Sequence, residues 1–216
     1  MTSTLTPGYQ RFAALIALIG WAALTAQLIL SFVFAGHMGV SPAVALWQYF
    51  GFFTITTNLL IAAVMTAAAR GRVLVPWLGE ASLLAGTTVA AVFLSVAFHV
   101  LLGAPAFDWL HWAVDGSLHY LVPALVVLFW LAGAPKAGLR FGEPFRWLLY
   151  PTAYLIYSWS RGAIDGWYPY FFLDVGHLGF GKALLMALAL AASFTLAGLA
   201  LVLLTRLIGR LRTVPA

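Results

Sequence analysis

Long apolar runs separated by short polar breaks dominate the chain. We expect helices over residues 12–35, 47–69, 82–102, 117–131, 147–160 and 183–204, with glycine in every break between them. A helix needs roughly 20 apolar residues to cross the hydrocarbon core of a bilayer, and the fourth and fifth runs are shorter than this. No alternation typical of barrel strands appears, so only helices satisfy this backbone in lipid. The pattern predicts an all-α polytopic membrane protein, a bundle of six transmembrane helices in a single domain over residues 1–216.

The composition agrees with this class. Of the 216 residues 63% are hydrophobic and 8% are charged, and the mean hydropathy is +0.99. A soluble domain carries roughly 25% charged residues. The chain is therefore neither a soluble globular domain, nor disordered, nor a nucleic-acid binder. The absence of cysteine from the sequence excludes a disulfide framework, a zinc–thiolate site and a cysteine nucleophile.

The basic residues are divided unevenly between the predicted loops. Nine fall on one side of the bilayer: Arg11, Arg70, Arg72, Lys136, Arg140, Arg146, Arg206, Arg210 and Arg212. Arg161 and Lys182 fall on the other side. The positive-inside rule then predicts that both termini are cytoplasmic. All five histidines and four aspartates lie on the outer side, so we expect any polar site at or just below the outer surface.

Three polar residues lie within the second predicted span. Thr54, Thr57 and Asn58 are spaced so that they share one face of a helix. In one interpretation the threonine hydroxyls bond back to the preceding turn, and Asn58 joins two helices. In the other they belong to a functional site, because polar groups within a bilayer are costly and usually functional.

A second polar segment runs from Asp108 to Pro123. His119 lies about one turn into the fourth predicted span, where it is either hydrogen-bonded inside the bundle or acts as a base. Asp115 precedes the predicted helix and is equally well interpreted as its N-cap. On a continuous helix Asp108, His111, Asp115 and His119 would share a face and suit zinc or manganese. A helix start at Asp115 would break that face, so we predict no metal and no cofactor.

A third polar segment, 157–171, contains Arg161 at the end of the fifth predicted span. Arg161 either anchors the helix at the interface among aromatic residues or holds a carboxylate. Tyr168 lies in the Trp-Tyr-Pro sequence that follows it.

Together these three segments resemble the androgen-induced membrane proteins, a family of six-helix threonine hydrolases, and in particular its bacterial branch. The matching segments are Tyr49 to Leu60, Ser117 to Pro123, Tyr150 to Gly162 and Trp167 to Tyr170. They are similar to the family's aromatic-rich second-helix motif, its small-apolar-His segment, its fifth helix and its Trp-Tyr-Pro segment. They occur in the family order over about residues 47–179. The chain differs in a shorter spacing from His119 to Pro123, and in having Asp115 where Asn and His occur.

The resemblance implies a function that the composition does not. Animal members hydrolyse esters between a fatty acid and a hydroxy fatty acid with a threonine nucleophile and a histidine. The match places Thr54 at the nucleophile position and His119 at the histidine position. It implies a lipid ester hydrolase without a cofactor, embedded in the bacterial inner (plasma) membrane, with its site near the outer leaflet.

Other residues receive supporting roles in this hypothesis. Asp115 would orient the imidazole, Asn58 would donate to the oxyanion, and Arg161 would hold a free carboxylate of the substrate. Thr57 and Tyr168 complete the predicted site. Two alternatives stay open. One is a non-enzymatic six-helix protein that binds or transports lipids or small molecules, although the sequence predicts neither broken helices nor inverted repeats. The other is a metal-dependent membrane enzyme.

Overall fold

The computed structural model describes residues 2–103 and 108–212, and no β-strand occurs within these two ranges. The prediction of an all-α fold is therefore confirmed. Residue contacts group the chain into two compact units, Met1–Pro135 and Lys136–Ala216. The single domain over residues 1–216 stays a prediction.

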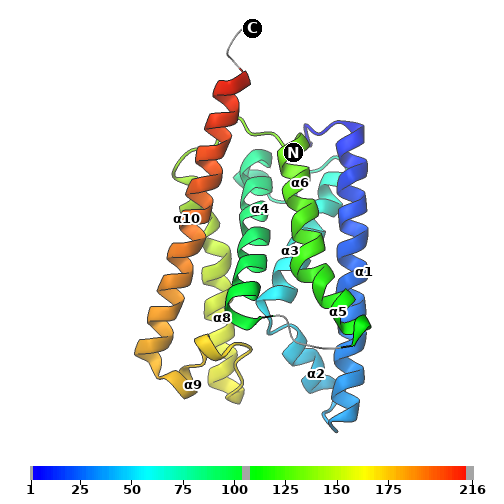
Figure 1. Ribbon diagram of the computed structural model, residues 1–216, viewed down its shortest axis with the longest axis vertical. Coiled ribbons are helices and arrows are strands. Elements are labelled where there is room, and N and C mark those ends of the chain that lie inside the picture. Colours follow the sequence, from blue (N-terminus) through cyan, green and yellow to red (C-terminus); the bar gives the residue numbers. More distant parts are fainter. Residues whose placement is uncertain (1, 104–107, 213–216) are drawn as a thin grey trace. The chain divides into compact units, whose positions relative to one another are not determined.

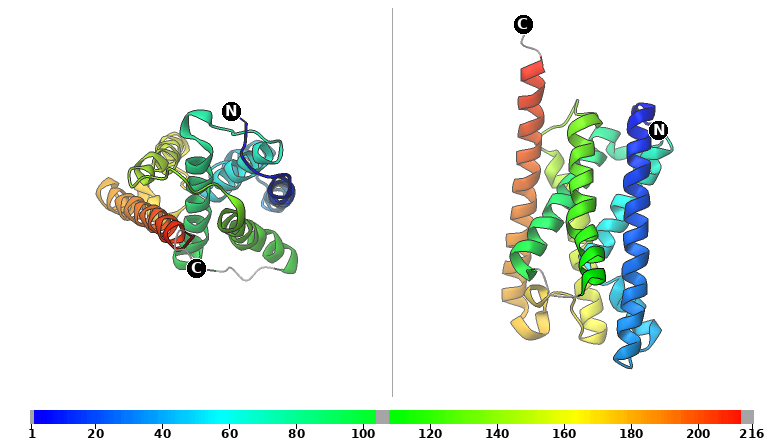
Figure 2. Two further views of the ribbon diagram at one scale, coloured as in Figure 1. Left: turned by 90° about the horizontal axis from the view of Figure 1, so that it is seen from above. Right: turned by 45° about the vertical axis from the view of Figure 1, so that its right-hand side comes forward.

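The first unit contains the N-terminal helices (Figure 1). Its elements are α1 (Pro7–His37), α2 (Pro42–Tyr49), α3 (Phe53–Ala69), η1 (Pro76–Leu78), α4 (Glu80–Ala97), η2 (Phe98–Leu102), α5 (Trp109–Gly116), η3 (Ser117–Leu121) and α6 (Val122–Gly133). η1 is a 3₁₀ turn, whereas η2 and η3 are single π-helical turns. α1 packs along α3, and α4 packs along α6. α2, η2 and α5 lie toward the same end of this unit (Figures 1 and 2).

Among the described residues, four helical stretches are long and apolar enough to cross a membrane: Pro7–His37, Glu80–Leu102, Trp109–Gly133 and Phe180–Gly209. The bent pair α2 and α3 adds a fifth if its two halves are one span. The chain therefore has the helices of a multi-pass membrane protein. The remaining predicted span corresponds to a helix of 17 residues, α8 (Leu149–Asp165). Six spans and cytoplasmic termini stay predictions.

The predicted span 47–69 is broken, which corrects the expectation of no broken helix. α2 ends at Tyr49 and α3 begins at Phe53, and the two helices are bent by 70°. Gly51 is a weak helix former. Phe52 has extended backbone angles, φ −77° and ψ 134°, as the N-cap of α3. Because the break is rich in aromatic residues, its hydropathy resembles that of a continuous span. The bend places Thr54 in the first turn of α3.

The predicted helix start at Asp115 is wrong. A continuous helical stretch, Trp109–Gly133, runs through α5, η3 and α6. Its N-cap is Asp108, whose carboxylate accepts from the backbone N–H groups of Leu110 and His111 at 3.0 Å each. Donation from the His111 backbone is the main cause that lowers the pKa of the Asp108 carboxyl. Asp115 therefore lies inside the helix, where its side chain is not used as a cap.

Small residues allow close packing between α1 and α3. A Cβ added to Gly20 would lie 3.5 Å from the Cβ of Ala62, which is ordinary contact distance. Nearby, Trp21 Nε1 donates to Thr66 Oγ1 at 3.1 Å. Small residues and interhelical hydrogen bonds are typical of helix pairs in membranes. α1 thus supports the helix that carries Thr54.

The second unit contains α7 (Glu143–Trp147), α8, η4 (Phe171–Leu173), α9 (Val175–Leu178) and α10 (Phe180–Arg212). α7 and η4 pack against α10. The predicted span 147–160 ends too early. α8 ends at Asp165 and is capped by Gly166, whose left-handed conformation (φ 73°) is one that glycine adopts at little cost. Arg161 therefore lies inside α8 and not at its end.

Candidate active site

Thr54 and His119 form a hydrogen-bonded pair within the first unit. Thr54 Oγ1 lies 3.0 Å from His119 Nε2. The two residues are 8% and 5% exposed, respectively. Thr54 belongs to the first turn of α3 and His119 to the π-helical turn η3. The structure thus brings together the two residues predicted to be catalytic, at the distance expected of a nucleophile and its base.

Asp115 contacts the other nitrogen of the His119 ring. Asp115 Oδ1 lies 3.0 Å from His119 Nδ1, and the Asp115 backbone oxygen lies 3.0 Å from the same atom. Carbonyl oxygens and ionised carboxylates only accept hydrogen bonds. This assigns the ring proton to Nδ1 and leaves Nε2 to accept from the Thr54 hydroxyl. The three residues have the arrangement of nucleophile, base and orienting carboxylate found in catalytic triads.

Phe98 fixes the plane of the His119 ring. Phe98 is the first residue of η2, and its ring centroid lies 3.6 Å from that of His119 with an interplanar angle of 16°. Each of the stacked rings therefore comes from a π-helical turn, a feature often found at functional sites. Phe98 could not be predicted from the sequence, because a phenylalanine near the end of an apolar run carries no distinguishing signal.

Pro123 leaves backbone carbonyls near His119 without their usual donors. In η3 the Val122 N–H donates to the Ser117 carbonyl, five residues back. The next π-helical donor, for the Leu118 carbonyl, would be Pro123. An α-helical pattern would instead assign Pro123 to the carbonyl of His119. Since proline has no N–H, neither bond can form.

Two side chains supply the missing donors. Asn58 Nδ2 donates to the Leu118 carbonyl at 3.1 Å and to the Thr54 carbonyl at 2.9 Å. Ser95 Oγ donates to the His119 carbonyl. Buried carbonyls require such partners. α3 and α4 therefore each hold the turn that carries His119.

Asn58 is hydrogen-bonded within the protein, and its role as an oxyanion donor stays a prediction. Its side chain is fully buried, and the donations from Nδ2 go to two backbone carbonyls, so it links α3 to η3. This agrees with the alternative interpretation of Asn58 as a connection between helices. Thr57 is likewise buried in α3 with 0% exposure, but the hydroxyl that contacts His119 is that of Thr54.

The four residues considered as metal ligands form two pairs. His111 Nδ1 lies 2.8 Å from Asp108 Oδ2, whereas His119 Nδ1 is paired with Asp115. Across residues 2–103 and 108–212, no group of three or more His, Asp or Glu side chains is placed to hold a metal ion. The geometry therefore lends no support to the metal-dependent alternative.

Arg161 and Tyr168 belong to the second unit. Arg161 is 3% exposed, and its guanidinium donates to the Tyr157 hydroxyl at 2.6 Å. It also lies 5.2 Å from the centroid of the Tyr157 ring. Tyr168 packs closely on Gly162, where an added Cβ would come within 2.1 Å of its ring. Arg161 is thus held by a protein partner, while the roles of both residues toward a substrate stay predictions.

Replacing Ser95 by alanine is expected to destabilise the protein by about 0.6–1.7 kcal/mol, which spans the average and the largest value measured for interhelical hydrogen bonds in a membrane protein. The change removes the donor to the His119 carbonyl. The matched control is Ser193→Ala in α10, because Ser193 Oγ donates at 2.9 Å to Ala189 O of its own helix. Thermal unfolding in detergent should show a lower midpoint for Ser95→Ala alone. Equal midpoints for the two variants would contradict the role assigned to Ser95.

Comparison with protein-family models, with curated proteins and with solved structures finds no match for this chain. The family resemblance of its motifs stays a prediction, and the geometry of Thr54, His119 and Asp115 becomes the main basis for inferring a function.

Proposed function

We propose that this protein is a membrane-embedded ester hydrolase in which Thr54 is the nucleophile and His119 the general base. The observation that supports this most strongly is the 3.0 Å contact between Thr54 Oγ1 and His119 Nε2. A threonine hydroxyl is a poor nucleophile unless an adjacent base takes its proton. Asp115, on the opposite ring nitrogen, holds the imidazole in the tautomer that can accept this proton.

In the proposed reaction His119 Nε2 takes the hydroxyl proton as Thr54 Oγ1 attacks the ester carbonyl carbon. A carbon–oxygen bond forms, the carbonyl oxygen becomes an anion, and Asp115 stabilises the imidazolium. Collapse of this intermediate breaks the bond to the alcohol, which leaves with the proton from Nε2. Water, deprotonated by His119 Nε2, then attacks the acyl carbon. The bond from that carbon to Thr54 Oγ1 breaks, Oγ1 regains its proton from Nε2, and the acid is released.

The first turn of α3 is a favourable place for a developing oxyanion. The N-terminal end of a helix carries a partial positive charge equivalent to roughly half an elementary charge. Preorganised dipoles of this kind stabilise charge that appears in the transition state. Because Asn58 donates to two backbone carbonyls, we assign oxyanion stabilisation to the N-terminal end of α3.

The proposed substrate is a lipid ester. The buried position of Thr54 in a chain with several membrane-crossing helices favours a substrate that partitions into the bilayer. The resemblance to androgen-induced membrane proteins points to the same class. Membership of the bacterial branch of that family, and a place in the bacterial inner membrane, are parts of this proposal.

Labelling with a fluorophosphonate probe tests the proposal without a known substrate. The probe phosphonylates activated hydroxyls, so the purified protein is expected to become labelled on the peptide that contains Thr54. The same reaction after heat denaturation is the control, since activation requires the folded pair. Failure of the folded protein to react, or labelling at another residue with Thr54 unmodified, would count against the hydrolase.

We further propose six spans with both termini in the cytoplasm, in which α8 is the short fifth span. The uneven distribution of basic residues supports this orientation. Local thinning of the bilayer accommodates the 17 residues of α8.

An alkaline phosphatase fusion after Ala216, which lies outside the described residues, is expected to be inactive in a bacterial host, whereas a cytoplasmic reporter at the same position should be active. The matched control is a phosphatase fusion in the loop after α1, at Gly39, which should be active in the periplasm. An active phosphatase at Ala216 would overturn the orientation.

The bend between α2 and α3 favours a second candidate function, that of a protein that binds or carries a lipid. Broken helices are typical of transport sites, and this break immediately precedes Thr54. The two functions differ in their dependence on the hydroxyl: binding should survive Thr54→Ala, whereas hydrolysis should not.

A further inference from the structure

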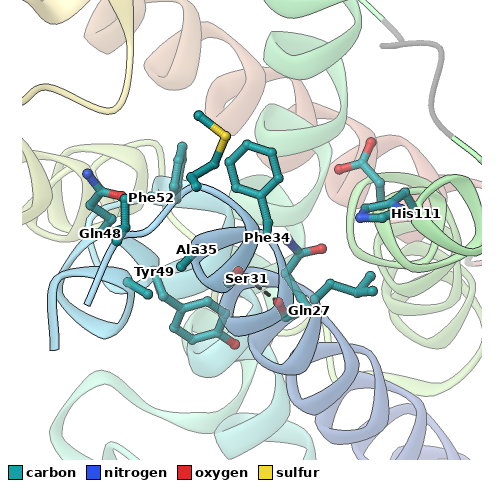
Figure 3. Close-up of a pocket in the computed structure, with 13 residues that line it drawn as sticks. Gln27, Ser31, Phe34, Ala35, Gln48, Tyr49, Phe52 and His111 are labelled. Atoms are coloured by element: carbon teal, nitrogen blue, oxygen red, sulfur yellow. Dashed lines mark hydrogen bonds between the residues drawn. The ribbon is translucent and has the colours of Figure 1, made fainter. Parts of the chain in front are cut away.

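A cavity lies in the first unit, between α1, α2 and α5 (Figure 3). Its volume is about 490 Å³, which is in the range of small-molecule sites. Apolar residues such as Phe34 and Phe52 form much of its wall, together with a few polar side chains. In Figure 3 the side chains of α1 lie between those of α2 and His111 of α5.

The cavity shares one residue with the proposed catalytic unit. Asp115 lines it and also contacts the ring of His119 at 3.0 Å. Phe52, another lining residue, is the N-cap of α3, two residues before Thr54. A molecule in the cavity is therefore adjacent to the site of the proposed chemistry and touches the carboxylate that orients its base.

Two polar side chains in the wall are placed to form hydrogen bonds with a ligand. Gln27 and Gln48 line the cavity, and within the described part of the chain neither side-chain amide has a protein partner. Each amide carries two donors and one acceptor. By contrast, the hydroxyls of Ser31 and Tyr49 already donate to backbone carbonyls, at 2.8 Å in both cases.

The charge of the wall selects against anions. The cavity wall contains the carboxylate of Asp115, and no lysine or arginine is among the described residues that line the cavity. Among the described lining residues, the side chain that could carry a positive charge is His111, and it is paired with Asp108 at 2.8 Å. A ligand carboxylate would face Asp115 without an opposing cation, and like charges placed together are unfavourable.

We infer that this cavity binds the head of an uncharged, hydroxyl-bearing amphiphile of the acylglycerol class, and that it discriminates against free fatty acids. The hydroxyls pair with the amides of Gln27 and Gln48, and the adjoining carbons contact the apolar wall. This differs from the expectation that Arg161 holds a free carboxylate. The identification of the bound lipid as the substrate rests on the proposed function, whereas the binding of this lipid to the cavity does not.

The inference is tested by photocrosslinking to the full-length Thr54→Ala variant in nanodiscs, where hydrolysis is prevented. The probes are a monoacylglycerol and a free fatty acid that carry the same diazirine-containing chain. We expect the monoacylglycerol to label peptides from regions 27–52 and 108–115 at least about tenfold more than the fatty acid, equivalent to about 1.4 kcal/mol. Excess unlabelled monoacylglycerol should suppress this signal, which separates the cavity from bulk lipid contacts.

A charge change in the wall provides the matched comparison. Gln48→Lys places a cation in the cavity and is expected to raise fatty acid labelling, so that the tenfold preference is largely lost. Ala43→Lys adds the same charge to the exposed surface of α2 outside the cavity and should leave the preference unchanged. Equal responses to the two lysines would contradict a role for the cavity wall.

Three outcomes would overturn the inference: equal labelling by both probes in the Thr54→Ala protein, stronger labelling by the fatty acid, or stronger labelling by a matched probe with a choline head. The last result would show selection for cations. The proposed hydrolase is judged separately by fluorophosphonate labelling of the parent protein at Thr54. Crosslinking without fluorophosphonate labelling would therefore support the lipid-binding site and contradict the proposed hydrolase.

Discussion

Thr54→Ala and His119→Ala are each expected to lower the rate of fluorophosphonate labelling by on the order of 10⁴–10⁶-fold, as for other nucleophile–base pairs. The reason is that Thr54 Oγ1 forms the covalent bond, and that His119 Nε2, 3.0 Å away, is the group placed to take its proton. Residues that act as a unit are strongly non-additive. The double variant should therefore label little more slowly than either single variant.

Two further substitutions separate this pair from a general effect of polar residues in α3. Thr54→Ser keeps the hydroxyl and should retain measurable labelling. Thr57→Ala alters a fully buried threonine on the same helix and should react much closer to the parent rate. All variants should elute as monodisperse particles of the parental size. Parental labelling by a folded Thr54→Ala variant would exclude Thr54 as the nucleophile.

Periodicity and hydropathy were sufficient to predict the helices but not where they bend or begin. The break before Phe53 was missed because Phe50 and Phe52 are as apolar as a span, while the backbone is turned by Gly51 and its neighbours. The start of the helix at Asp108 could not be predicted either, because Asp108 and Asp115 are both suitable N-caps. Asp115 is followed by a glycine, which is typical of a helix boundary. The sequence alone does not show which aspartate accepts hydrogen bonds from the first N–H groups of the helix.

The candidate site was only partly predictable for a different reason. Motifs indicated Thr54 and His119, whereas the partner of each buried carbonyl depends on which helices are neighbours. Pro123 did provide a signal, because a proline inside a span leaves carbonyls without donors. Polar residues elsewhere in the apolar spans are then candidates to replace them. Asn58 and Ser95 donate hydrogen bonds to these carbonyls, which explains their positions better than a direct part in catalysis.

The second large effect is expected from Asp115→Asn. The carboxylate can only accept from His119 Nδ1, whereas an asparagine amide can also donate to it, which favours the tautomer with the proton on Nε2. That tautomer cannot take the proton of Thr54. A comparable change in a Ser-His-Asp triad costs about 10⁴-fold in kcat. The Asp115 backbone oxygen, 3.0 Å from Nδ1, remains in the variant and still accepts, so we expect a loss between about 10² and 10⁴.

The matched control for this prediction is Asp108→Asn, which changes an aspartate seven residues earlier on the same helical stretch. Asp108 caps α5 and contacts His111, and it does not contact His119 Nδ1. Labelling rates measured across a range of pH should be depressed at every pH for Asp115→Asn and close to parental for Asp108→Asn. Because the asparagine changes the tautomer and not only the charge, raising the pH should fail to restore the rate. Full recovery at high pH would mean that Asp115 tunes the basicity of His119 without orienting its ring.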